Sequence, residues 1–241
     1  MLCIVLRTLN VGEMDKRVTL FSRETGRIDA TARGCRKVGS PLLAATQVFA
    51  CSEISFNRSK DGHYFMTQAE VKQNFPRVTR SADIFTCGSL LLELCERTIV
   101  ADAPEPRQFA LLASALYNLD KGPDPGTVFT FFIFKLLDIQ GMRPTLSRCV
   151  KCGAPPANKL NISAGGAVCA NCAGEKAPGL AFETITKIMK TPSKNMDSIG
   201  TVSLDIVKLA RKWMPQAVSY MPKSTILFDT TIKKWEARKE A

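Results

Sequence analysis

Polar and apolar positions alternate with a period of about two through much of the first 75 residues. The clearest runs are residues 17–23 and 28–34, which flank a short turn at Gly26. Successive side chains of a strand point to opposite faces, so these runs predict a β-hairpin. Weaker runs of the same kind cover residues 3–9, 47–57 and 63–71. Five short strands joined by turns predict a small closed barrel of the OB type, and the pattern alone leaves an SH3-like barrel open.

From residue 81 onward the apolar positions recur at helical spacing. Ser81 and Asp83 supply a candidate N-cap and a first-turn carboxylate for the first helix. Helices are expected at residues 84–100, 109–119, 127–139, 181–190, 203–212 and 224–238. The third of these is apolar nearly all round, which predicts burial. The fold class is therefore α+β, with an OB-type barrel at 1–80 and a helical domain at 81–241. A zinc-ribbon-like insertion at 149–172 interrupts the helical domain.

Four cysteines in the second half of the chain form two matched Cys-x-x-Cys pairs, Cys149 with Cys152 and Cys169 with Cys172. Sixteen residues separate the pairs, a spacing typical of a tetrahedral zinc site built on two tight turns. Gly153 follows the first pair, where such a turn needs a residue that tolerates a positive φ. Because four thiolates close the coordination sphere, we predict one structural Zn²⁺ per chain and no metal-based catalysis.

Redox chemistry, disulfides or a vestigial empty site remain alternatives for these cysteines. No secretion signal is recognisable at the N-terminus, which favours a reducing, cytoplasmic compartment. The remaining cysteines lack a partner at ligand spacing and are expected to act as small buried hydrophobes. They are Cys3, Cys35, Cys51, Cys87 and Cys95.

The charge balance adds a candidate partner. The net charge is +11 and the isoelectric point about 9.3, which favours a polyanion such as nucleic acid, although a merely basic surface would give the same numbers. Residues 1–80 hold thirteen Lys and Arg against seven Asp and Glu, so the excess is densest in the barrel. No apolar run is long enough to predict a membrane span.

Within the barrel the cations cluster near the ends of the second and third strands. The candidate DNA-binding residues are Arg17, Arg27, Arg33, Arg36 and Lys37, with Arg7 as a weaker addition. Arginine pairs two phosphate oxygens with its planar fork, so these side chains suit a nucleic-acid backbone. Phe21 and Phe49 could stack on bases, but their places in alternating runs favour the core. The sequence therefore predicts binding driven by charge and largely blind to base sequence.

Several segments carry a resemblance to a known family. They are RVTLFSRETG (17–26), TARGCRK (31–37), FKLLDIQGMRP (134–144), the two cysteine pairs and PKS (222–224). Each is modest alone, but their order and spacing together resemble the bacterial RecO family of recombination mediators.

The resemblance implies several activities. RecO-like proteins bind single- and double-stranded DNA, anneal complementary strands and, with RecR, help to load RecA on DNA coated by single-strand DNA-binding protein. They also dock the acidic, Phe-ended tail of the single-strand DNA-binding protein on the helical domain. The resemblance further implies a bacterial, nucleoid-associated location and a metal that supports the fold. An apolar pocket rimmed by cations would suit the tail, and the candidates for its rim are Arg107, Arg143, Lys208 and Arg211.

Two other classes of protein compete with this interpretation of the sequence. An enzyme is disfavoured because no P-loop, dinucleotide glycine pattern or nucleophile elbow occurs, and the only histidine, His63, stands between a turn and a strand. The alternative function is a zinc-ribbon regulator that binds duplex DNA sequence-specifically, with contacts near Lys151, Lys159 and Lys176. We therefore predict a non-enzymatic mediator of recombinational DNA repair.

Overall fold

The computed structural model describes residues 1–155, 157, 159–173 and 180–240. The chain divides into two compact units, Met1–Asp120 and Lys121–Ala241. The expected division at residue 80 marks where strands give way to helices, whereas the compact units separate forty residues later. Whether residues 1–80 form an independent DNA-binding domain stays a prediction.

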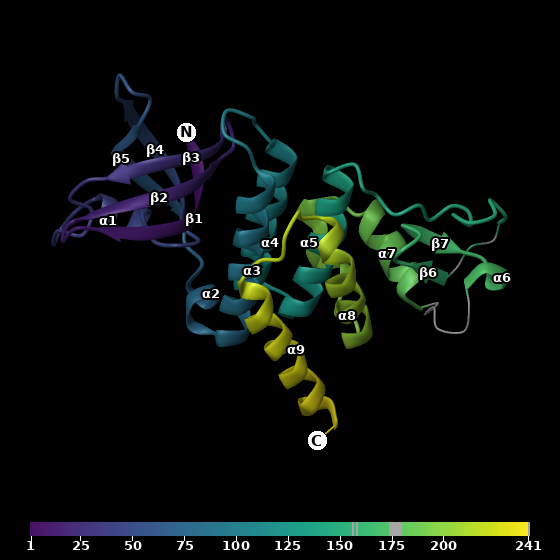
Figure 1. The fold of residues 1–241 in the computed structure, drawn as a ribbon. Helices are drawn as coiled ribbons and strands as arrows, with labels where there is room; N and C mark the ends of the chain where they lie inside the picture. Colours follow the sequence, from purple (N-terminus) through teal and green to yellow (C-terminus); the bar gives the residue numbers. More distant parts are fainter. Residues whose placement is uncertain (156, 158, 174–179, 241) are drawn as a thin grey trace. The chain divides into compact units, whose positions relative to one another are not determined.

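The first unit begins with a closed five-stranded barrel whose strands neighbour one another in the order β1-β2-β3-β5-β4 (Figure 1). The strands are β1 (Leu2–Val11), β2 (Asp15–Ser22), β3 (Gly26–Ala32), β4 (Cys51–Arg58) and β5 (Tyr64–Gln73). All neighbours pair antiparallel except β3 and β5, which pair parallel over two residues. The predicted OB-type barrel is therefore confirmed.

Alternation along the strands fills the barrel. Inward positions such as Val18, Leu20, Ile28 and Ala30 are buried in one cluster, while Asp29, between Ile28 and Ala30, is exposed. A short helix, α1 (Leu42–Ala45), packs against β5 and adds Leu42 to this cluster. The helix was not predicted, because four residues are too few to show a helical period.

Three helices complete the first unit: α2 (Pro76–Arg80), α3 (Ala82–Thr98) and α4 (Pro106–Lys121). Phe21 of the barrel meets Phe109 edge to face at 5.4 Å, and Phe49 meets Phe85 at 5.6 Å. Both barrel rings are at most 2% exposed, so their assignment to the core is confirmed. Ser81 does occupy the N-cap of α3, but its side chain makes no capping hydrogen bond.

The second unit is built around α5 (Pro125–Ile139), which contacts α7 and α8. The Asp124 carboxylate accepts hydrogen bonds from the first-turn N–H groups of Gly126 and Thr127 and so starts this helix. Every residue from 126 to 134 is buried, as the all-round apolar pattern predicted. The remaining helices are α6 (Ala170–Ala173), α7 (Leu180–Lys190), α8 (Leu204–Trp213) and α9 (Ser224–Glu240), with 3-10 turns η1 (Ser193–Ile199) and η2 (Met214–Gln216).

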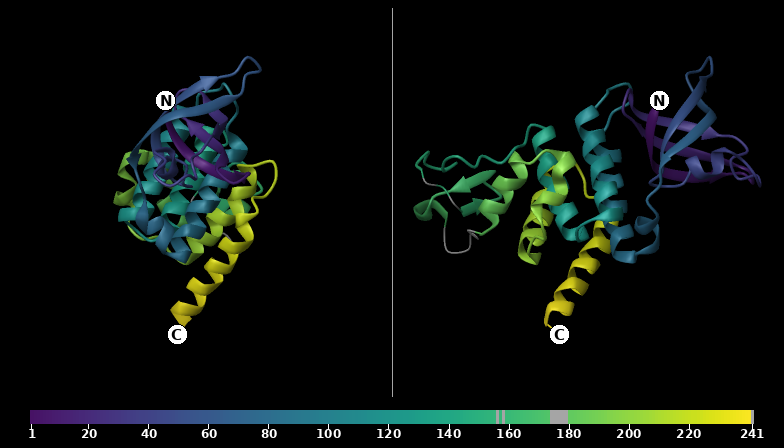
Figure 2. Two further views of the ribbon diagram at one scale, coloured as in Figure 1. Left: turned by 90° about the vertical axis from the view of Figure 1, so that its left-hand side faces the viewer. Right: turned by 180° about the vertical axis from the view of Figure 1, so that it is seen from behind.

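A two-stranded hairpin, β6 (Lys159–Asn161) and β7 (Gly166–Val168), carries the second cysteine pair. Figure 2 shows it next to α7, which contacts β6. A parallel bridge from Thr145 to Gly166 adds the incoming chain to its edge. None of the described helices is long and apolar enough to cross a membrane.

Candidate metal centre and nucleic-acid interface

The four predicted ligands meet in space. The sulfur atoms of Cys149, Cys152, Cys169 and Cys172 all lie within 4.8 Å of one another. The Sγ atoms of Cys152 and Cys169 are 3.7 Å apart. Four sulfurs at a zinc–sulfur distance of about 2.3 Å in a tetrahedron stand about 3.8 Å from each other, so the donor set fits such an ion. The cysteines therefore form a site that could hold a metal ion.

Backbone hydrogen bonds shape the two turns that present these sulfurs. In the first turn Gly153 donates its N–H to the Cys149 carbonyl at 2.8 Å and has a φ of 75°. In the second turn Cys172 donates to the Cys169 carbonyl at 3.1 Å. The Val150 N–H bonds the Ala167 carbonyl at 2.9 Å and so ties the two turns together across the hairpin.

The thiols differ in their readiness to ionise. Hydrogen bonding from the Cys169 backbone lowers the pKa of the Cys149 thiol to about 6. A hydrogen bond with the Cys169 thiol raises the pKa of Cys172 to about 12. One thiolate therefore forms easily near neutrality, whereas completing the set of four needs a cation to displace protons.

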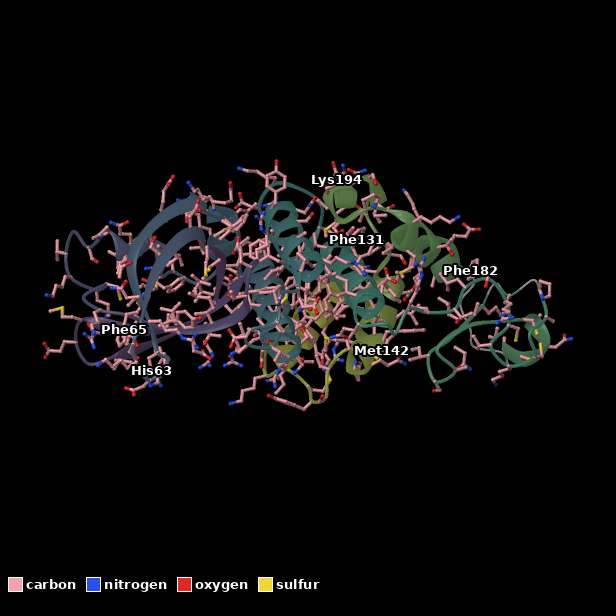
Figure 3. All side chains as sticks on the ribbon, turned by 90° about the horizontal axis from the view of Figure 1, so that it is seen from above. His63, Phe65, Phe131, Met142, Phe182 and Lys194 are labelled. Carbon is pink, nitrogen blue, oxygen red and sulfur yellow. The ribbon has the colours of Figure 1, made fainter. Side chains whose placement is uncertain are left out.

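Among the described residues, the apolar cluster beside the site is small. It contains four buried residues, Cys149, Ala157, Ala167 and Val168, and six partly buried ones. Phe182 of α7, labelled in Figure 3, lies partly buried against this cluster. Because few apolar side chains stabilise this segment, an ion bound by the four cysteines would cross-link it.

The predicted DNA-binding cations fall into two groups. Arg27 pairs with Asp29 at 3.1 Å and reaches Glu96 at 4.0 Å, and Arg7 pairs with Glu96 at 3.0 Å. Thr19 joins this network by donating to Asp29 at 2.7 Å. Carboxylates on the protein therefore already balance Arg7 and Arg27, which weakens their case as phosphate ligands.

Arg17, Arg33, Arg36 and Lys37 form the second group, the free-cation end of the barrel. All four are exposed, and within residues 1–120, all described, none of them pairs with a carboxylate. Arg36 donates from Nη1 to the Gly12 carbonyl at 3.2 Å, which holds the loop after β3 on the β1–β2 turn. These four cations carry charge that the protein itself leaves unbalanced.

Two carboxylates also belong to this end. The Asp15 side chain accepts the Gly34 N–H at 2.7 Å and so shapes the loop that bears Arg33 and Arg36. Glu13 is exposed at the β1–β2 turn. The four cations outnumber these two acids, so the end keeps a positive balance.

Sequence reasoning missed an aromatic contribution here. The Arg33 guanidinium carbon lies 4.4 Å from the centroid of the half-buried Phe65 ring, and Arg58 lies 5.2 Å from that of Tyr64. Figure 3 shows Phe65 and His63 close together on the barrel. The alternation of side chains along a strand could have identified Phe65, because Phe65 precedes the inward Met66 and must therefore point outward.

The four cations expected to rim a tail pocket do not share one environment. Lys208 pairs with Glu236, and Arg211 makes a two-pronged pair with Asp229 at 2.7 and 2.9 Å, so carboxylates of α9 engage both. Arg107 belongs to the first compact unit, apart from the other three in the chain. Arg143 lies 3.6 Å from the Asp138 carboxylate and is the one of these four cations that lines the described pocket of about 510 Å³. The same pocket is lined by Leu146, Phe182, Met189 and Lys190.

No described constellation suggests catalysis at His63, whose side chain is exposed and whose backbone N–H bonds Ser59 at 3.1 Å. Of the lysines considered for a zinc-ribbon regulator, Lys176 lies outside the described residues. Lys151 is exposed and Lys159 is half-buried.

Fold and site together define a protein with an OB-like barrel, a free-cation end on that barrel, and a helical part carrying four clustered cysteines that could hold a metal ion. Residues 2–75 match the family model described as Recombination protein O N terminal, and residues 81–205 match Recombination protein O C terminal. The chain belongs to the RecO family of DNA repair proteins. Because the match covers both the barrel and the helical part, the zinc-ribbon regulator is not favoured.

Curated relatives agree. The DNA repair protein RecO of Caldicellulosiruptor saccharolyticus is 32% identical over 203 residues, which cover 83% of each chain. The DNA repair protein RecO of Streptomyces avermitilis is 34% identical over 185 residues, covering 73% of each chain. The one from Halalkalibacterium halodurans is 30% identical over 208 residues, covering 83% of this chain and 80% of the relative.

Proposed function

We propose that this protein binds single- and double-stranded DNA through its barrel, anneals complementary strands, and with RecR promotes RecA loading on DNA coated by single-strand DNA-binding protein. It does so without catalysing a covalent step, beside the bacterial nucleoid. The observation that carries the proposal is the free-cation end in a chain of the RecO family. Four cations without carboxylates can neutralise phosphates of two strands and let them approach.

The strength of this binding should follow salt. If Arg17, Arg33, Arg36 and Lys37 each contact one phosphate, log K on single strands falls with log salt with a slope of about −3. Binding of this kind releases counterions and carries no base preference, which suits annealing of any complementary pair.

Strand annealing tests the proposal directly. Two complementary oligonucleotides, one quenched on pairing, are mixed with and without protein, without ATP, at two salt concentrations. We expect acceleration that fades with salt. The double variant R17A/R36A should anneal more slowly, whereas R7A/R27A, which removes the same charge from the network around Asp29 and Glu96, should stay near wild type. Equal loss in both variants would show that overall charge, and not the free-cation end, is responsible.

We further propose that the metal is Zn²⁺ and that its role is structural. Cys149, Cys152, Cys169 and Cys172 would hold it, and four sulfur ligands leave no position for substrate or water. Mass spectrometry under native conditions should find one zinc per chain. A different metal, or a stoichiometry well below one, would contradict this assignment.

For the tail of single-strand DNA-binding protein we propose the pocket rimmed by Arg143. Its apolar lining, Leu146, Phe182 and Met189, suits a phenylalanine ring, and the two cations at its edge suit carboxylates. The variants R143E and K190E should weaken binding of a tail peptide in fluorescence anisotropy. K194E is the matched control, because Lys194 is exposed and does not line the pocket. Unchanged affinity in both pocket variants would remove the assignment.

A further inference from the structure

Phe65 stands in a cross-strand row on the outer face of the barrel. Leu9 of β1 pairs with Arg17 of β2, and Arg17 pairs with Thr31 of β3. Thr31 in turn pairs with Phe65 of β5, so the row contains one residue from each of these four strands. Arg33 lies just beyond the end of β3, two residues after Thr31, and its guanidinium carbon is 4.4 Å from the centroid of the Phe65 ring. The row thus leads from an exposed apolar side chain through a free cation to a half-buried aromatic ring.

The neighbouring Tyr64 serves the fold instead. It packs against the barrel core and meets Phe56 edge to face at 5.7 Å. The cation that lies over the Tyr64 ring is Arg58. Arg58 donates a hydrogen bond from Nε to the Gly62 carbonyl at 3.3 Å, so the β4–β5 turn holds it in place. This hairpin extends beyond the rest of the barrel in both views of Figure 2. Phe65, on the opposite side of β5, has no such place in the core.

Arg33 makes the Phe65 ring part of a layered surface. The guanidinium carbon is 4.4 Å from the ring centroid, so the cation lies over the ring, and its side chain is exposed. A guanidinium is planar and weakly hydrated, and both it and a phenyl ring are surfaces on which nucleobases stack. Arg17 is two strands away along the row, about 10 Å at the usual strand spacing. Arg17, a cation without a carboxylate partner within residues 1–120, is therefore close enough to the ring to bind a phosphate next to a stacked base.

We propose that Phe65 and Arg33 form a stacking site for an unpaired nucleobase, with Arg17 holding a neighbouring phosphate. The occupant is single-stranded nucleic acid. Free cations beside the ring complement a polyanion, and the Phe65 ring with Arg33 over it offers a stacking surface to an unpaired base. Bases inside a duplex are paired and stacked and cannot reach it. Every base has a π face, so the site discriminates strandedness and not sequence. This inference rests on the proposed DNA binding and adds a second, non-ionic component to it.

The test separates stacking from charge. Affinity is measured for a single-stranded oligonucleotide, a fully abasic strand of the same length and a duplex, on wild type, F65L and F65W. We expect F65L to lose roughly 5- to 100-fold on the base-bearing single strand, with little change on the abasic strand or the duplex and an unchanged salt slope. F65W should restore or exceed wild-type affinity. R33K keeps the charge but loses the plane, and should weaken only base-bearing single strands.

The outcomes distinguish the stacking site from the proposed DNA binding. Equal affinity of F65L and wild type for the base-bearing strand overturns the stacking site and leaves the proposed DNA binding intact. Equal losses on all three ligands show a structural or purely ionic role and overturn it as well. Failure of the wild-type protein to bind any of the three would instead refute the proposed function. Thermal melting of each variant confirms that the barrel remains folded.

Discussion

Removing the metal, or replacing Cys149 with serine, should unfold the segment from residue 145 to residue 173 and leave the barrel unchanged. Cys149 is 1% exposed and belongs both to the sulfur cluster and to its small apolar cluster. The barrel has its own core in residues 1–120 and none of these ligands. DNA affinity per folded molecule should therefore change little.

The magnitude follows from what holds the segment. Two of the four buried residues of the cluster are alanines, so burial supplies only a few kcal/mol. A structural zinc site contributes on the order of 10 kcal/mol when its ligands are otherwise unfolded. Even a loss of about 4 kcal/mol would raise the open population about 1000-fold, since each tenfold change corresponds to about 1.4 kcal/mol.

Hydrogen exchange measures this opening directly. The amides of Val150, Gly153 and Ala167 are hydrogen-bonded inside the segment, so peptides covering them should lose protection after chelation. The matched control is C35S, because Cys35 is equally buried but lies in the barrel and is not a ligand. C35S should keep its zinc and its protection at residues 145–173.

Two results would refute the reasoning. Unchanged exchange in the metal-free protein would show that packing alone holds the segment. A folded C149S protein that had lost DNA binding would show that the metal site supports function by some route other than local structure.

Three further predictions concern the site and the fold. Metal release to a chelator should increase as pH falls from 8 to 5.5, and a pH titration of zinc content checks this. The reason is that Cys149, whose pKa is lowered to about 6, and Cys172, whose pKa is raised to about 12, must both be deprotonated to bind the metal. Gly26→Ala should cost several kcal/mol in chemical denaturation, because a Cβ there would lie 2.3 Å from a carbonyl oxygen, whereas Gly12→Ala, also at positive φ but in open space, should cost only about 1–2 kcal/mol. Phe129→Ala should cost about 3–5 kcal/mol, since this ring is fully buried in α5; a much smaller loss would mean that the neighbouring helices collapse into the space.

Much of the secondary structure was predictable because it depends on local periodicity. The expected helices at 127–139 and 181–190 differ from α5 and α7 by no more than two residues at either end. Short elements such as α2 and η2 escaped, because fewer than two turns leave no period to detect. The sequence indicates the β6–β7 hairpin only through Gly165 and Gly166, two glycines shortly before the second cysteine pair, and Gly165 has a φ of 74° in the turn.

The candidate site divides in the same way. The clustering of the four cysteines that could hold a metal ion was predictable, because Cys-x-x-Cys spacing already places two sulfurs on one turn. The candidate DNA-binding cations could be named from the sequence as a group, but Arg27 and Arg17 look alike there. Only the fold brings Glu96, from a helix about seventy residues further along the chain, beside Arg27.

The sequence by itself determined the α+β class, most of the longer strands and helices, the four cysteines that could hold a metal ion and the family resemblance, because each depends on neighbours within a few residues or on fixed spacing. Only the tertiary structure decided which cations stay free, which aromatic ring faces outward beneath one of them, and which predicted rim residues are already paired. These depend on contacts between residues far apart in the chain, such as Arg33 with Phe65 and Arg211 with Asp229. Charge and aromaticity are properties of a residue, whereas availability for a ligand is a property of its surroundings in the fold.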